Sequence, residues 1–148
     1  MIFPTILVPI DTSFETDYWV KAPLQQAVEM AQRPGGLIHV MSVIPRDLLD
    51  GYYPNLHRLE IASQVKNRLD AIVASHCPAD VNVVTSVAEG GICPEILRVA
   101  REVTADAIVM ASHGPVFKDY VLGSNSTHIA LHAHCSVFVV RDTQLEAA

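Results

Sequence analysis

The chain has 148 residues, half of them apolar, which is enough for one core, so we expect one domain over residues 1–148. Its net charge of −6 argues against a nucleic acid partner, because no basic surface is evident. Without a long apolar run or the pattern of a secretory signal, we expect a cytoplasmic protein with no membrane insertion.

Strands and helices are predicted to alternate along the chain. Short apolar, β-branched runs predict buried strands at residues 6–10, 37–44, 81–87, 107–111 and 136–141. Apolar residues at helical spacing predict helices over about 18–32, across 59–73, around 94–103 and from 123 onward. Pro23 conflicts with an uninterrupted first helix, so we expect that helix to begin near Pro23, with the proline in its first turn. This alternation predicts a parallel sheet with helices on both faces.

Two small-residue turns are candidates for an anion site. Ligands of an open parallel sheet bind beyond the carboxyl ends of the strands, where the winding direction reverses. Residues 123–126 (Gly-Ser-Asn-Ser) open a predicted helix, whose N-terminus favours anions, although an ordinary helix cap explains them about as well. Their pairing with residues 112–114 (Ser-His-Gly) favours a phosphate site, because two such turns can wrap one polyphosphate.

The histidines of the C-terminal part and the cysteines are candidates for metal binding and catalysis. His128 and His132 share a helix face, but no other Cys or His group completes a clear metal motif, so we expect a helix surface and assign no metal site. Ser112 and His113 are neighbours that point to opposite sides of an extended chain, so they form no catalytic dyad by themselves. The widely spaced cysteines are expected to be free thiols: Cys77, Cys93 and Cys135.

Six short segments, spread over nearly the whole chain, together match a known sequence pattern. They are residues 6–11 (ILVPID), 43–45 (VIP), 89–90 (EG), 110–114 (MASHG), 122–124 (LGS) and 132–141 (HAHCSVFVVR). Together they resemble the universal stress protein family, whose ATP-binding members carry G-x2-G-9x-G-[ST] after the fourth strand. Here Ala111 stands at the first glycine and eight residues separate Gly114 from Gly123, which is similar to the family's nucleotide-binding F and G subgroup.

The resemblance implies a fold and a ligand. The fold is a single-domain, doubly wound five-stranded parallel sheet in three α/β/α layers, of the adenine-nucleotide α-hydrolase-like type. The ligand is ATP, or ADP or AMP, with Mg²⁺ on its phosphates. Adenine would lie against Val43 and the turn formed by Pro9, Ile10, Asp11 and Thr12, with Asp11 facing the sugar or the metal. Ribose and phosphates would contact Met110, Ala111, Ser112, His113 and Gly114, and the phosphate tail Gly123, Ser124, Asn125 and Ser126.

The resemblance also implies a role and an assembly. We expect a stress-response protein in which ATP occupancy acts as a switch, changing residues 115–121 or the surface of a homodimer formed through the last strand. No dedicated catalytic base or G-x4-G-K-[ST] loop is visible, so ATP hydrolysis should be slow. Two alternatives are an enzyme of related fold that hydrolyses ATP or transfers adenylyl groups, and a dimeric scaffold that binds no nucleotide.

Overall fold

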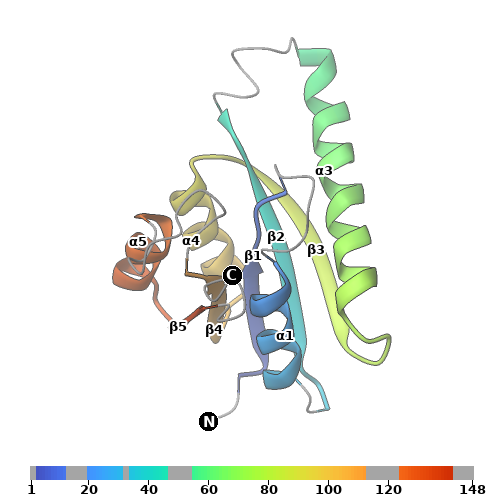
Figure 1. Ribbon diagram of the computed structural model, residues 1–148. Coiled ribbons are helices and arrows are strands. Elements are labelled where there is room, and N and C mark those ends of the chain that lie inside the picture. Colours follow the sequence, from blue (N-terminus) through green and yellow to red (C-terminus); the bar gives the residue numbers. More distant parts are fainter. Residues whose placement is uncertain (1–2, 13–19, 32–33, 47–54, 113–123, 142–148) are drawn as a thin grey trace.

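The computed structural model describes residues 3–12, 20–31, 34–46, 55–112 and 124–141, which form one parallel sheet with helices on both faces (Figure 1). The strands are β1 (Thr5–Pro9), β2 (Leu37–Pro45), β3 (Asn82–Gly90), β4 (Ala107–Ala111) and β5 (Ser136–Val140). The helices are α1 (Lys21–Met30), α3 (Asn55–His76), α4 (Ile92–Glu102) and α5 (Ser124–His132). This three-layer α/β architecture with five parallel strands confirms the predicted fold.

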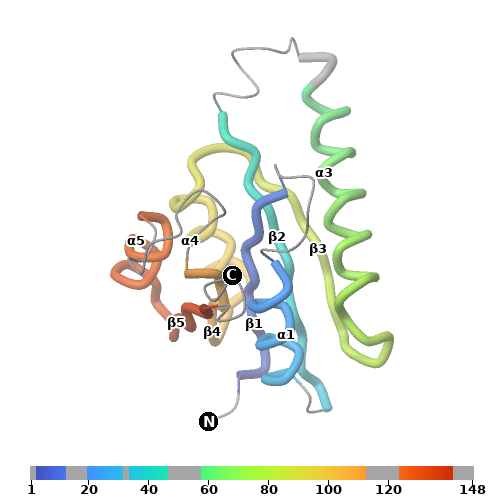
Figure 2. Tube along the Cα trace, in the orientation of Figure 1, coloured from blue at the N-terminus to red at the C-terminus, as the bar shows by residue number. Residues whose placement is uncertain are grey.

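The core has two halves, one on each face of the sheet. Successive side chains of a strand point to opposite faces. On β1, Ile6 and Val8 therefore join a cluster with buried residues of α1 and α3, whereas Leu7 joins a cluster with buried residues of α4 and α5. All three side chains are fully buried, as the central position of β1 requires. The result is the layering seen in Figure 2, with α4 and α5 together on one side.

The order of the strands explains where a ligand crevice can form. It is β3-β2-β1-β4-β5, so the chain winds outward from β1 through β2 to β3 and then resumes on the other side of β1 with β4. The carboxyl ends of β1 and β4 therefore flank the point at which the winding direction reverses. Within the described part of the chain, no helix has both the length and the apolar character needed to cross a membrane.

Two element boundaries show how the sequence directs the backbone. Pro23 lies in the first turn of α1, as predicted, where a missing N–H costs no helical hydrogen bond. The third strand is longer than the predicted 81–87, because Glu89 pairs with Ile44 and Gly90 with Pro45. Only Gly91 therefore separates β3 from α4, which begins at Ile92. Gly90 has φ of 139°, a conformation that favours glycine.

Candidate functional site

The end of β1 lies beside the middle of β2. The Ile10 N–H donates to the Met41 carbonyl oxygen at 2.8 Å, which carries the β1–β2 ladder one residue past Pro9. Ile10 is buried, whereas the Asp11 side chain is exposed and Thr12 is half-buried. Val43 follows Met41 by two residues on the same strand and packs against the α4 and α5 cluster. The predicted adenine-binding residues thus occupy one edge of the sheet.

The hydrogen bonds between β4 and β5 also continue one residue past the end of β4. Met110 and Ala111 pair with Val139 and Val140, and the Ser112 N–H then donates to the Val140 carbonyl oxygen at 3.0 Å. Ser112 is only 3% exposed, so the chain is still buried one residue past the end of β4. The winding direction of the sheet reverses between β1 and β4. The carboxyl edge on the β4 side of this point therefore holds Met110, Ala111 and Ser112, and the β2 residue Val43 lies on the other side.

Ser126 attaches the beginning of α5 to the end of β4. Its hydroxyl is positioned to donate to the carbonyl oxygens of Ala111 at 2.9 Å and Ser112 at 3.2 Å, and the side chain is buried. Both acceptors lie beyond or at the last residue of the strand, where the ladder leaves carbonyl groups available. This hydroxyl fixes the N-terminus of α5 at the carboxyl edge of the sheet.

Asn125 has a partner that the sequence did not suggest. The Cys93 thiol, in the first turn of α4, is positioned to donate to the Asn125 side-chain oxygen at 3.3 Å. Burial raises the pKa of the Cys93 thiol, which keeps the donor protonated. The only signal in the sequence was that Cys93 follows the carboxyl end of a strand, and such ends share one edge of a parallel sheet. Cys93 thereby links the N-termini of α4 and α5.

The carboxyl edge brings together eleven of the residues proposed from the sequence. They are Pro9, Ile10, Asp11, Thr12, Val43, Met110, Ala111, Ser112, Ser124, Asn125 and Ser126. The other three, His113, Gly114 and Gly123, lie outside the described residues, as does the predicted switch segment 115–121. Ser124 and Asn125 are exposed at the start of α5, where the first backbone N–H groups have no helical acceptor. This arrangement is suited to holding an anion beside a sheet edge.

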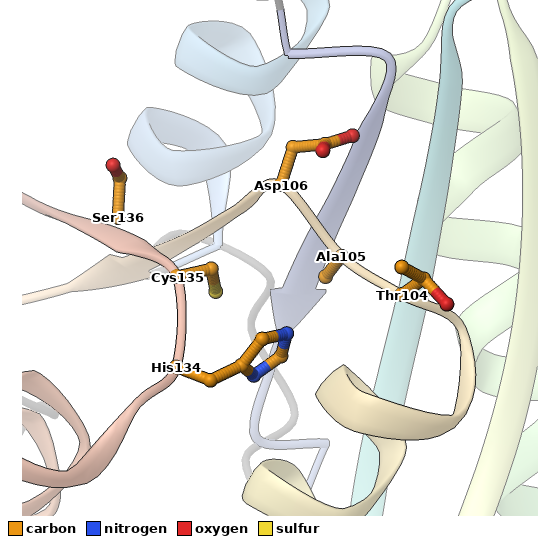
Figure 3. A pocket seen from close by; sticks show the side chains of 6 residues that line it. All are labelled: Thr104, Ala105, Asp106, His134, Cys135 and Ser136. Atoms are coloured by element: carbon orange, nitrogen blue, oxygen red, sulfur yellow. The ribbon is translucent and has the colours of Figure 1, made fainter.

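A surface hollow lies at the opposite edge of the sheet (Figure 3). It is lined by Thr104, Ala105, Asp106, His134, Cys135 and Ser136, none of which belongs to the predicted nucleotide site. Burial raises the pKa of the Cys135 thiol, and the negative charge of Asp106 raises it further, so this thiol is a poor nucleophile. The hollow therefore offers no activated cysteine.

The strand order and the helices on both faces define an open, doubly wound α/β protein. The Universal stress protein family model matches residues 3–141, and the chain belongs to this family. This assignment confirms the resemblance inferred from the sequence. A curated relative, Universal stress protein G of Escherichia coli O157:H7, is 29% identical over 145 residues, covering 95% of this chain and all of the relative.

Solved structures show the same fold. Hypothetical protein MJ0577 superimposes with a TM-score of 0.80 at 22% identity, covering 96% of this chain and 98% of its own. A universal stress protein from Archaeoglobus fulgidus in complex with dAMP gives 0.64 at 22% identity over 95% and 99% of the two chains. A universal stress protein in complex with cAMP gives 0.60 at 18% identity over 95% and 98%.

Proposed function

We propose that this chain is an adenine-nucleotide-binding universal stress protein that binds ATP, with little or slow hydrolysis, and acts in the stress response as a ligand-dependent switch. One observation carries this proposal. The Ser126 hydroxyl holds the N-terminus of α5 against the carboxyl end of β4, on the edge where Asp11 follows β1. A helix N-terminus fixed at a topological switch point is a favourable place for phosphate groups.

The relatives and the exposed polar groups support the choice of ligand. Two structures of the same fold are described as complexes with dAMP and cAMP, which share the adenine base and a phosphate. In this chain, Val43 is half-buried on the edge where adenine would lie, and Ser124 is exposed where phosphates would lie. Adenine therefore meets a partly apolar surface, and the charged phosphates meet backbone donors near solvent.

Mg²⁺ is proposed as the companion of the phosphates. The side chains of Asp11, Thr12 and Ser124 supply carboxylate and hydroxyl oxygens at this edge, and Mg²⁺ accepts such donors together with water and phosphate. The ion would neutralise phosphate charge. The chain's own contribution is to orient the nucleotide through its strand ends and the start of α5.

Native mass spectrometry of the purified protein tests the ligand. We expect a co-purifying ATP, ADP or AMP, and a reproducible absence of any nucleotide would favour the dimeric scaffold. Turnover is measured separately on the same sample. Consumption of ATP at an ordinary enzymatic rate, about 10 s⁻¹, would contradict the switch hypothesis and favour an ATP-hydrolysing or adenylyl-transferring enzyme.

A charge placed at the start of α5 tests the phosphate position. Ser124→Asp keeps a residue that is favoured in the first helical turn, so the fold should be retained, but its carboxylate repels phosphate. We expect ATP affinity, measured by calorimetry, to fall by at least about tenfold, with a smaller loss for AMP.

Ala130→Glu is the matched control for this substitution. It adds the same charge to an exposed position on α5, nearly two turns away from Ser124, and should change ATP affinity by less than about twofold. Equal ATP affinities for Ser124→Asp and the unsubstituted protein would contradict the proposal that the phosphate tail binds at the start of α5.

The proposed assembly is a cytoplasmic homodimer formed through β5. This strand is an edge of the sheet and pairs only with β4 among the described residues, and its four apolar residues, 137–140, are all partly exposed. An apolar edge strand invites pairing with another copy. Analytical ultracentrifugation should give twice the chain mass, and a monomer at micromolar concentration would contradict the dimer.

A further inference from the structure

Two histidines on the outer side of α5 lie close enough to act together. The imidazole rings of His128 and His132 have their centroids 4.4 Å apart, with an angle of 39° between the ring planes. Both residues are exposed. The inner side of the same helix is formed by the buried residues Ser126 and Ile129, which attach α5 to the rest of the protein. The histidine pair therefore sits on a helix whose orientation is already fixed.

From the sequence alone we expected a plain helix surface here, but the ring geometry points to a ligand: we infer that His128 and His132 form a two-nitrogen binding site for a divalent transition metal ion of the Ni²⁺, Cu²⁺ or Zn²⁺ type. Imidazole nitrogen is a preferred ligand of these ions. Two nitrogens that each lie about 2.0–2.1 Å from one ion are roughly 3 Å from each other. The ring centroids are 4.4 Å apart and the nitrogens lie on the ring edges, so a small rotation of the exposed rings brings two nitrogens to this separation.

The electrostatic setting also favours a cation. His132 is the last residue of α5, and the C-terminal end of a helix carries partial negative charge. The whole chain has a net charge of −6, which attracts cations to the protein as a whole. Among the described residues, no group of three or more His, Cys, Asp or Glu side chains is placed to hold a metal. The pair therefore supplies two ligands, and water completes the coordination.

Metal binding has a structural consequence for α5. The two ligands are one helical turn apart, so one ion can bridge them only while this turn is helical. An ion that binds the folded helix and not the unfolded chain stabilises the folded protein. The site lies at the C-terminal half of α5, away from the N-terminal turn assigned to phosphate, so it stands independently of the proposed nucleotide site.

The experiment uses tag-free full-length protein with Ni²⁺ as the probe. Calorimetry gives the affinity, paramagnetic broadening of amide NMR signals locates the ion, and thermal unfolding reports the stabilisation. The variants His128→Ala and His132→Ala each remove one ligand from an exposed helical position, where alanine favours the helix. His134→Ala is the matched control, because His134 is also exposed but lies beyond the end of α5 and lines the hollow in Figure 3.

We expect one Ni²⁺ ion at α5, broadening centred on residues 128–132, and a raised unfolding temperature. Each single variant at the pair should weaken binding by at least about tenfold, because a second ligand on the same helix acts at high effective concentration. His134→Ala should leave the affinity unchanged. Unchanged Ni²⁺ affinity in His128→Ala or His132→Ala, or broadening centred elsewhere, would overturn the site.

Discussion

The two ends of the sheet use polar groups in different ways. At the amino end, the Asp106 carboxylate accepts the Thr5 N–H at 2.9 Å, while the Asp106 N–H donates to the Thr5 carbonyl oxygen at 2.8 Å. These groups satisfy each other and join the starts of β1 and β4. At the carboxyl end, Ser126 and Cys93 hold helix N-termini in place and leave Ser124 exposed. The amino end thus contributes stability, and the carboxyl end presents the candidate ligand groups.

The largest expected effect is on stability at the amino end. Asp106→Ala should lower the free energy of unfolding by about 2 kcal/mol, because the Thr5 N–H loses a charged acceptor. Urea unfolding measures this loss, and Asp106→Asn, which keeps an acceptor oxygen, should recover at least half of it.

The same variant should also change a nearby thiol. The pKa of Cys135 should fall in Asp106→Ala and the reaction of Cys135 with thiol reagents should accelerate, because a neighbouring negative charge is removed. A reduced ATP affinity in this variant would show that the two ends are coupled.

The next effect falls on the carboxyl end and should include ligand binding. Ser126→Ala removes the donor to the carbonyl oxygens of Ala111 and Ser112, which should cost about 1 kcal/mol of stability. Because the same hydroxyl positions the start of α5, ATP affinity should fall as well. Calorimetry with Ser126→Ala and Asp106→Ala side by side separates the two ends. Equal ATP affinities in these two variants would contradict the view that the carboxyl end serves ligand binding and the amino end only stability.

The smallest effect is a gain in stability beside the hollow. Thr104 follows α4 with φ of 53°, while the N–H groups of Thr104 and Ala105 donate to the carbonyl oxygens of Arg101 and Ala100. These two bonds form a Schellman motif, whose left-handed position usually holds glycine. Thr104→Gly should therefore raise the free energy of unfolding by roughly 0.5–1 kcal/mol, measured by thermal unfolding, with ATP affinity unchanged. A loss of stability would mean that the Thr104 side chain makes a compensating contact.

The strands and the layer order were predictable because their signals are local. Residues 107–111 form a short, uninterrupted apolar run, which is typical of a strand covered on both faces, and β4 has these bounds. Pro23 similarly marked the start of α1 because a proline restricts the backbone of its own turn. The extension of β3 to Gly90 was not predictable, because it depends on the neighbouring residues of β2, which are far away in the sequence.

The candidate site was predictable as a set of residues but not as a set of contacts. The small residues around 112 and 124–126 indicated a turn and a helix N-terminus, since both follow from chain geometry. The bond from Ser126 to the end of β4 and the bond from Cys93 to Asn125 join segments 14 and 32 residues apart. No periodicity or turn rule relates such positions.

The sequence by itself determined the alternation of strands and helices, the composition of the core and the identity of the residues at the strand ends, because each depends on neighbouring residues and on burial of apolar side chains. Only the tertiary structure decided that the Ser126 hydroxyl bonds to the end of β4, and that the rings of His128 and His132 lie side by side. Those outcomes depend on side-chain orientation and on which elements pack together. They are set when the parallel sheet brings distant segments to a common edge.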